Sequence, residues 1–412
     1  MASVEHVIAG LDIGTTKIGM VIGEVSEDGS INVLGVGQAN SEGLRKGVVV
    51  NIDKTVKAIE KARQEAELMA GIEINSVVVG IAGGHIKSIN SKGVVAITNQ
   101  NNEIMQEDVD RVIEQAKAIA IPMDREIIHV LPQEFIVDEQ TGIKEPVGMS
   151  GVRLEVEAHV VTGAITSAEN IYKSVEKAGL EVTDLVLEPL ASSYAVLTDD
   201  EKELGVALID MGGGTTDIAI FFDDAIRHTA VVGLGGRNVT SDIAIGIRTP
   251  LEQAEEIKKK HGIALSAKVG KDEYFEAPGV GGRESREISR SILASIIEPR
   301  LEEIFSLVHR EIKRSEFAEM LGAGIVITGG GALLEGMAEL AEQVFDMPVR
   351  IGNPRGFGGL AESVKSPVWA TGVGLIQYGL QHGTHLHGNS GKSKEGIKRI
   401  FEKVKQLFKD YF

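Results

Sequence analysis

Two stretches of the chain, about two hundred residues apart, share one order of apolar and polar positions. They are "HVIAGLDIGTTKIGMVIGEV", residues 6–25, and "GVALIDMGGGTTDIAIFF", residues 205–222. Each has an apolar run with an aspartate near its end, then glycine and two threonines, then a second apolar run. Apolar runs rich in Val and Ile around a Gly-Thr turn predict β-hairpins. A repeat at this spacing predicts an internal duplication and therefore two similar lobes.

The pattern also predicts an insertion in each half of the chain. Residues 85–160 combine a short helix, two proline breakers and alternating strands, which indicates a small inserted subdomain. The second insertion reads as mostly helical, with a helix expected from Ser285 to Arg314. The predicted division is 1–84 plus 161–203 for the first lobe, 85–160 for its insertion, 204–237 plus 322–380 for the second lobe, and 238–321 for the helical insertion.

Composition narrows the classes of function. The 412 residues carry a formal net charge of -18, which argues against nucleic acid as the main partner because phosphate binding needs clustered Lys and Arg. The chain has no cysteine, so disulfides and thiolate metal sites are excluded. The first residues lack the pattern of a secretory signal, and we expect no membrane-spanning run, so the body is expected in the cytosol.

The two turns suggest phosphate chemistry. Backbone N–H groups of Gly-Thr turns can surround a phosphate because glycine permits close approach, and the hydroxyls add donors. Asp12 and Asp210, each at a strand end, are expected to hold Mg²⁺ through its waters. One such turn alone is equally consistent with an ordinary hairpin. Two in equivalent places, with a third glycine cluster at Gly329, Gly330 and Gly331, favour a shared nucleotide site.

The C-terminal segment has a different pattern. Residues 381–396 are rich in Gly, Ser, His and Lys and predict a flexible linker. Residues 397–412 predict an amphipathic helix whose other face carries five basic and two acidic side chains. We expect it to bind an anionic membrane surface weakly and reversibly, although docking on the body is the alternative. Its apolar positions are Ile397, Ile400, Phe401, Val404, Leu407, Phe408 and Tyr411.

Several stretches resemble one known family. They include "AGLDIGTTKI", "RKGVVVNIDKTVKAI", "LPQEFIVDEQTGIKEPVGMSGVRLEVEAHVVTG", "LEPLASSYAVL", "DMGGGTTDIAIF", "VGLGGRNVTSDIA", "ITGGGALLEGM" and "SPVWATGVGLIQYG". Together they resemble the actin and sugar-kinase superfamily, and within it the FtsA family of bacterial cell-division proteins. The resemblance covers nearly all of residues 5–380 and implies an α/β, two-lobed actin-like fold of duplicated ribonuclease H-like lobes, with an inserted subdomain in each lobe.

The resemblance also implies roles for individual residues. Glu188 is similar to the residue that orients the attacking water in bacterial actins, and it joins Asp12 and Asp210 as a catalytic candidate. Glu255 and Lys258, which share one helix face, resemble a pair that contacts ribose and adenine. A solvated charged helix is the alternative for that pair. The remaining ATP contacts implied are Gly14, Thr15, Thr16, Lys17, Gly212, Gly213, Gly214, Thr215, Thr216, Gly235, Gly236, Gly329, Gly330 and Gly331.

The family implies partners as well as cofactors. These are ATP and Mg²⁺, other copies of the chain in a filament, other division proteins, and the C-terminal tail of the tubulin-like protein FtsZ on the helical insertion. Arg286, Arg290 and Arg300 are candidates to pair with that tail, and exposed surface arginines without a partner are the alternative. The expected location is the cytoplasmic side of the membrane at the division site, with at most weak ATPase activity.

Three other functions share parts of this pattern. A small-molecule kinase of the same superfamily would need a carboxylate base and a polar substrate pocket, and it has no use for a terminal amphipathic helix. A heat-shock ATPase would carry a β-rich peptide-binding domain. An actin-like pilus-assembly adaptor shares the nucleotide turns and lacks a reason for a lipid-binding helix.

Overall fold

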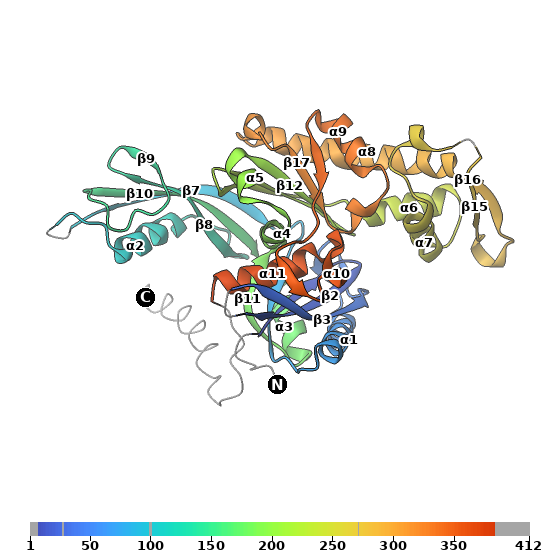
Figure 1. The fold of residues 1–412 in the computed structure, drawn as a ribbon, viewed down its shortest axis with the longest axis horizontal. Coiled ribbons are helices and arrows are strands. Elements are labelled where there is room, and N and C mark those ends of the chain that lie inside the picture. The colour runs from blue at the N-terminus through green and yellow to red at the C-terminus, as the bar shows by residue number, and fades with distance from the viewer. Residues whose placement is uncertain (1–6, 27–28, 99–100, 271, 384–412) are drawn as a thin grey trace.

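The computed structural model describes residues 7–26, 29–98, 101–270 and 272–383 (Figure 1). It contains two lobes, each built on a mixed β-sheet, with a smaller four-stranded sheet projecting from one end and a helical region from the other. Each lobe and the four-stranded subdomain has its own cluster of buried apolar side chains. The predicted α/β architecture of two lobes, with an insertion in each lobe, is therefore confirmed.

The first lobe has a six-stranded sheet in the order β11-β6-β1-β2-β3-β19. β1, β2 and β3 form an antiparallel meander, and β6 and β11 continue the sheet in parallel. Helix α1 packs against β2 and β3, and α11 packs against β1, β2 and β6. The strands are β1 (Val7–Ile13), β2 (Lys17–Val25), β3 (Ile31–Asn40), β6 (Ser76–Ile81), β11 (Glu181–Leu187) and β19 (Phe357–Gly359), and the helices are α1 (Ile52–Ala70), α3 (Ile165–Lys177), α4 (Glu188–Val196), α10 (Ala361–Val364) and α11 (Ala370–Gln381). A short hairpin, β4 (Leu44–Arg45) and β5 (Val48–Val49), precedes α1.

The second lobe repeats this topology. Its sheet has the order β14-β13-β12-β17-β18, with β12, β13 and β14 as the antiparallel meander and β17 parallel to β12. In both lobes, therefore, the first strand of the meander pairs in parallel with a later strand: β1 with β6 in the first lobe and β12 with β17 in the second. The elements are α5 (Asp199–Leu204), β12 (Val206–Met211), β13 (Thr216–Phe222), β14 (Ala225–Val232), β17 (Ile325–Thr328), α9 (Met337–Phe345) and β18 (Val349–Ile351).

The expected end of the second lobe differs from the structure. The sequence pattern predicts that all of residues 322–380 belong to that lobe, yet β19 pairs with β3 at the edge of the first sheet, and α11 lies on α4 and β1. Small residues permit this close approach: a methyl group on Gly374 would lie 1.8 Å from the carbonyl oxygen of Ala191. The chain therefore returns to the first lobe after β18, and α11 ends at Gln381, the first residue of the predicted linker.

The inserted subdomain contacts both lobes. Its sheet has the order β7-β10-β8-β9, covered on one face by α2. The hydroxyl of Ser88 donates to the carbonyl of Thr229 on β14 at 3.1 Å, and the amide of Gln133 donates to the carbonyl of Ile226 at 2.9 Å. The insertion of the first lobe is thus bound to an edge strand of the second. Its elements are β7 (Lys87–Ala96), α2 (Gln106–Lys117), β8 (Arg125–Val137), β9 (Gln140–Ile143) and β10 (Arg153–Ala164).

The helical insertion contains a hairpin that the sequence pattern did not predict. The expected helix from Ser285 is wrong at its start: residues 286–289 form β16, paired with β15, and the helix begins at Arg290. Ser289 caps that helix by accepting from the N–H of Ser291, which fixes the boundary. The elements are α6 (Gly236–Gly246), α7 (Leu251–His261), β15 (Tyr274–Ala277), β16 (Arg286–Ser289) and α8 (Arg290–Arg314).

Candidate functional site

The two Gly-Thr turns have the same geometry. The N–H of Gly14 donates to the carbonyl of Lys17 at 3.0 Å, and the N–H of Gly212 donates to the carbonyl of Thr215 at 3.0 Å. Each turn joins the first two strands of a meander, so the duplication places both at the same end of their sheets. The hairpins expected from the two apolar patterns therefore form, and their turns correspond one to one.

The turns meet where the lobes face each other. A methyl group on Gly213 would lie 2.4 Å from the Thr16 side chain, and one on Gly214 would lie 2.6 Å from the Thr15 hydroxyl. Such distances leave no room for a side chain, so glycine is required for this close contact. Thr15 and Thr16 of the first lobe thus touch the second-lobe turn, and residues separated by two hundred positions share one junction.

Two carboxylates lie just behind the turns. Asp210 accepts a hydrogen bond from Ser192 at 2.6 Å and a longer one from Thr371 at 3.4 Å. Burial raises the pKa of Asp210 to about 6. Burial also raises the pKa of Asp12, and the ammonium of Lys17, 3.5 Å away, opposes that rise. Both predicted metal-binding aspartates are thus buried at the junction and costly to ionise without a nearby cation.

Glu188 joins this group from the junction of β11 and α4. It is the first residue of α4, and a methyl group on Gly80 would lie 3.0 Å from its side chain. Burial, reinforced by Asp12, Asp217 and Asp210, raises the pKa of Glu188 well above its ordinary value. The structure therefore brings the three predicted catalytic residues together.

Asp217 is a member of the cluster that sequence reasoning missed. It lies on β13 directly across from Asp210 and is 3% exposed. Burial, followed by the charge of Asp210, raises the pKa of Asp217 to about 7, and its Oδ1 atom has no hydrogen-bond partner in the described part of the chain. The sequence did carry a signal, because an aspartate directly precedes the apolar run "IAIFF" in the second hairpin, whereas Gly19 occupies the equivalent place opposite Asp12 in the first.

The Lys17 side chain turns away from the backbone of its turn. Its ammonium donates to the carbonyl of Val368 at 2.7 Å and lies 4.2 Å from the centre of the Trp369 ring. Burial lowers the pKa of Lys17, while the charge of Asp12 opposes that change. Lys17 therefore balances the carboxylate cluster and anchors the segment before α11, and its backbone alone lines the turn.

The glycine pair before α6 packs on the second turn. The N–H of Gly236 donates to the carbonyl of Gly212 at 2.9 Å, so the start of α6 lies directly against that turn. Lys258 on α7 reaches the same place: its ammonium lies 3.1 Å from the carbonyl oxygen of Gly236 and 2.7 Å from Glu255. Glu255 also accepts from Thr240. The predicted pair is thus a partly buried ion pair at the start of α6, unlike a solvated charged helix.

The third glycine cluster packs against the end of β12. Gly329 follows β17 with a φ of 81°, and a methyl group there would lie 2.4 Å from Asp210. A methyl group on Gly331 would lie 2.5 Å from the Met211 side chain. The clusters at 212–214, 235–236 and 329–331 therefore all lie around the end of β12.

The three arginines proposed for partner binding are engaged within the chain. Arg290 pairs with Glu273 at 2.7 Å and with Glu335, and Arg300 pairs with Asp242 at 2.5 Å and with Glu303. The Arg286 guanidinium donates to the carbonyl of Ile247 at 2.5 Å. Each therefore stabilises the helical insertion, and a partner carboxylate would compete with these contacts.

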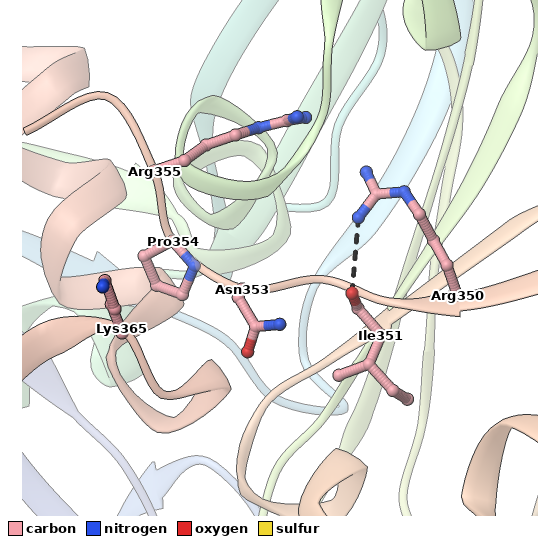
Figure 2. Close-up of a pocket in the computed structure, with 6 residues that line it drawn as sticks. All are labelled: Arg350, Ile351, Asn353, Pro354, Arg355 and Lys365. Carbon is pink, nitrogen blue, oxygen red and sulfur yellow. Dashed lines mark hydrogen bonds between the residues drawn. The ribbon is translucent and has the colours of Figure 1, made fainter. Parts of the chain in front are cut away.

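The described ranges contain neither a membrane-spanning helix nor a direct metal site, and a cleft on them lies away from the turns. No helix there is long and apolar enough to cross a membrane, and no group of three His, Asp or Glu side chains there could hold a metal ion directly. An open cleft of about 570 Å³ lies where the chain passes from β18 of the second lobe back to the first lobe. None of the residues of the two turns lines it. Figure 2 shows the residues that line it: Arg350, Ile351, Asn353, Pro354, Arg355 and Lys365. The predicted membrane helix, 397–412, lies outside the described residues.

Comparison with known proteins places this geometry in a family. A family model described as "Cell division protein FtsA" matches residues 207–374, and one described as "SHS2 domain inserted in FTSA" matches residues 83–162. The cell division protein FtsA of Pseudomonas aeruginosa is 50% identical, over 100% of both chains. That of Neisseria meningitidis is 48% identical over 96% of this chain and 94% of its own, and that of Escherichia coli K12 is 43% identical over 98% and 97%.

Solved structures support the fold. The PilM-PilN type IV pilus biogenesis complex contains a chain that matches with a TM-score of 0.65 at 18% identity, over 90% of this chain and 98% of its own. MreB5 of Spiroplasma citri bound to ADP matches with a TM-score of 0.56 at 14% identity, over 92% and 97%. With actin-like neighbours, a family-specific inserted domain and relatives matched along their whole length, this chain belongs to the FtsA family of bacterial cell-division proteins.

Proposed function

We propose that this chain is an actin-like adaptor that holds ATP with Mg²⁺ between its lobes and, when assembled, tethers the FtsZ ring to the cytoplasmic membrane. The observation that carries the nucleotide part is the contact between Thr15 and Thr16 on one turn and Gly213 and Gly214 on the other. One glycine- and threonine-rich turn from each lobe is thereby brought to one place, as two-sided binding of a phosphate chain requires.

The surroundings of the turns suit a nucleotide. The start of α6 lies directly against the second turn, where the N–H groups of Gly236 and Arg237 donate to the carbonyls of Gly212 and Gly213. The positive end of the helix dipole would therefore favour a phosphate bound at that turn. The Glu255 and Lys258 pair is positioned for ribose and base, since it lies beside Gly236 at the same helix start. Gly329 and Gly331 pack against Asp210 and Met211 at the end of β12, so their backbone would lie close to a nucleotide bound at the turns.

The carboxylate cluster suits a divalent cation. Asp12, Glu188, Asp210 and Asp217 lie together, and Lys17 is the cation that opposes their charge. The free oxygen of Asp217 is a further sign of a missing positive partner. We propose that Asp12 and Asp210 hold Mg²⁺ through water, where the ion would neutralise phosphate charge. Glu188 would orient a water for attack on the terminal phosphate.

Nucleotide binding is testable by isothermal titration calorimetry with ATP and Mg²⁺. We expect a single site per chain, lost on Gly213→Ala because the new methyl group meets Thr16. A change of Gly142, which has open space around its Cα and lies on the insertion, to Asn is the matched control, since Asn tolerates its positive φ of 73°. Calorimetry in which Gly213→Ala binds as well as the parent would contradict a site between the turns.

The membrane part of the proposal rests on the sequence of residues 397–412. Half-burial of seven apolar side chains yields on the order of 5 to 8 kcal/mol, with about 1 kcal/mol for each basic group near anionic lipid. Ordering the helix costs about 1 kcal/mol or more for each residue. A single helix therefore binds reversibly, and self-assembly of ATP-bound chains into a filament would add the avidity that makes attachment firm.

Co-sedimentation with liposomes of anionic lipid tests this coupling. The full chain is expected to pellet more with ATP than without it, and a chain that ends at Gly396 is expected to remain in the supernatant. Sedimentation without liposomes reports self-assembly separately. If the full and shortened chains pellet equally, the helix is not the anchor.

The FtsZ contact is proposed on the helical insertion, near Arg286, Arg290 and Arg300. An Arg290→Glu variant is expected to bind the FtsZ tail peptide more weakly than the parent. Because Arg290 also pairs with Glu335, Glu335→Gln is the matched control: it removes one internal ion pair and leaves the arginine. A loss of affinity in both variants would indicate a structural role, and unchanged affinity in Arg290→Glu would remove the assignment.

A further inference from the structure

Lys46 occupies a strained position between the two lobes. It and Gly47 form the two-residue connection between β4 and β5, and their φ angles are 52° and 76°. Such a connection favours Asn-Gly, because both residues adopt left-handed backbone conformations. A lysine in the first place costs about 1 kcal/mol of strain. The hairpin itself does not require a lysine, and the strain therefore indicates a use for this side chain outside the hairpin.

The loop that carries Lys46 touches both turns. The N–H of Gly47 donates to the hydroxyl of Thr15 at 2.9 Å, which ties the loop to the first turn. A methyl group on Gly214 would lie 3.0 Å from the Cα of Lys46, and one on Gly233 would lie 3.9 Å from its ammonium nitrogen. The Lys46 side chain thus extends from the second turn toward the segment that leads into α6.

Lys46 also differs from the other lysines of this region. Lys17 is buried and bound to the carbonyl of Val368, and Lys258 is paired with Glu255. Lys46 is exposed, and its ammonium makes no hydrogen bond or ion pair within the described ranges. Of these three cations it is the one available to an incoming anion.

We propose that Lys46 binds the terminal phosphate of a nucleoside triphosphate and so couples that phosphate to closure of the lobes. The proposal rests on the ATP site proposed above and adds a ligand to it. Because the loop belongs to the first lobe while its side chain lies along the second, the ammonium reaches the phosphate only when the lobes are together. A diphosphate lacks the group that Lys46 binds, so Lys46 distinguishes the two nucleotides.

The test compares a non-hydrolysable ATP analogue with ADP, each with Mg²⁺, on the full chain by calorimetry. Lys46→Gln is expected to weaken analogue binding by about tenfold or more, as loss of a charge-assisted hydrogen bond implies, and to change ADP binding by less than about twofold. Lys46→Arg keeps the positive charge and should therefore retain most of the parent's preference for the ATP analogue over ADP. Lys57→Gln, an exposed lysine on α1, is the matched control and should leave both affinities unchanged.

The outcomes separate this proposal from the ATP site itself. If the parent binds both nucleotides and Lys46→Gln retains the parent's preference for the analogue, the role of Lys46 is refuted and the site stands. If the parent binds neither nucleotide, the ATP site is refuted and Lys46 loses its role with it. Equal losses for analogue and ADP would show that Lys46 only shapes the site, which also overturns the proposal.

A Lys46→Gly variant provides a readout that a structural role would not give. Glycine adopts a φ of 52° without strain. This relief offsets the larger conformational entropy that glycine gives the unfolded chain, so the nucleotide-free variant should unfold close to the parent's temperature. Its affinity for the analogue should fall as in Lys46→Gln. A fall of more than about 5 °C without nucleotide would mean that the side chain supports the fold, and would contradict the proposal.

Discussion

His159 offers a quantitative test of how the inserted subdomain is bound to the second lobe. It lies on β10 and is 1% exposed. Its ring nitrogens lie 2.7 Å from Asn90 on β7 and 2.9 Å from Thr229 on β14, so one imidazole joins the insertion to the second sheet. Burial, helped by the nearby His228, lowers the pKa of His159 from 6.5 to about 3. The imidazole is therefore neutral in the folded protein under ordinary conditions.

The sign of the pH effect follows from this shift. Between pH 6.5 and 3 the unfolded chain binds a proton at this histidine and the folded chain does not, so the free energy of unfolding falls as the pH falls. The contribution is fully present above pH 6.5. At pH 4.5 the loss from His159 alone is about 2.7 kcal/mol, two pH units at about 1.36 kcal/mol each.

Urea unfolding followed by circular dichroism at pH 7.5 and 4.5 measures the effect. His159→Gln is expected to be less stable than the parent at pH 7.5, by about 1 to 3 kcal/mol from lost packing and hydrogen bonds. Its further loss on going to pH 4.5 should be smaller than the parent's by about 2.7 kcal/mol. His382→Gln, at an exposed position, is the control. It shows the effect of removing a histidine that does not connect the inserted subdomain to the second lobe.

Nuclear magnetic resonance of the imidazole gives the direct check. The His159 ring signals of the folded protein should show no titration above pH 4. A midpoint near 6.5, or parallel losses of stability in the parent and His159→Gln between pH 7.5 and 4.5, would refute the argument that this imidazole is held neutral between the insertion and the second lobe.

Three other changes should have defined results. Asp217→Asn in metal-free protein should raise the free energy of unfolding at pH 8 by about 2 to 4 kcal/mol, and by less at pH 5. The reason is that the folded-state pKa of Asp217 is about 7, so the parent loses stability as the pH rises from 4 to 7. Chemical denaturation at both pH values measures this difference. Gly374→Ala should destabilise the fold by about 1 to 3 kcal/mol, since the methyl group meets the Ala191 carbonyl, as thermal unfolding would show. Arg290→Ala should lower the unfolding temperature by no more than about 2 °C, because its partners Glu273 and Glu335 are exposed and exposed ion pairs contribute little to stability.

Much of the candidate site could be predicted from local pattern. An apolar run, an aspartate and a Gly-Thr turn specify a hairpin through neighbouring residues alone, and their repetition indicated two lobes with Asp12 and Asp210 in equivalent places. Asp217 was missed because its importance comes from the strand opposite: alone it is a polar residue in an apolar run, and beside Asp210 it is part of a buried acidic cluster.

Helix boundaries and domain limits could not be predicted as well, because they depend on contacts between residues that are far apart in the sequence. The helix expected from Ser285 begins instead at Arg290, because residues 286–289 form a strand that pairs with residues 274–277. The glycines of α11 do not indicate in the sequence which lobe the helix packs against. The close approach of α11 to α4 in the folded chain places it on the first lobe.

The sequence by itself determined the two duplicated hairpins, the insertions and the family resemblance, since periodicity and turn chemistry act over a few residues. Tertiary structure alone decided what each charged side chain does. Lys17 is engaged by a carbonyl 351 positions away, Arg290 and Arg300 are paired within the helical insertion, and Lys46 remains available beside the turns. The physical reason is that burial and partner distance set the energy of a charge, and both are properties of the folded chain.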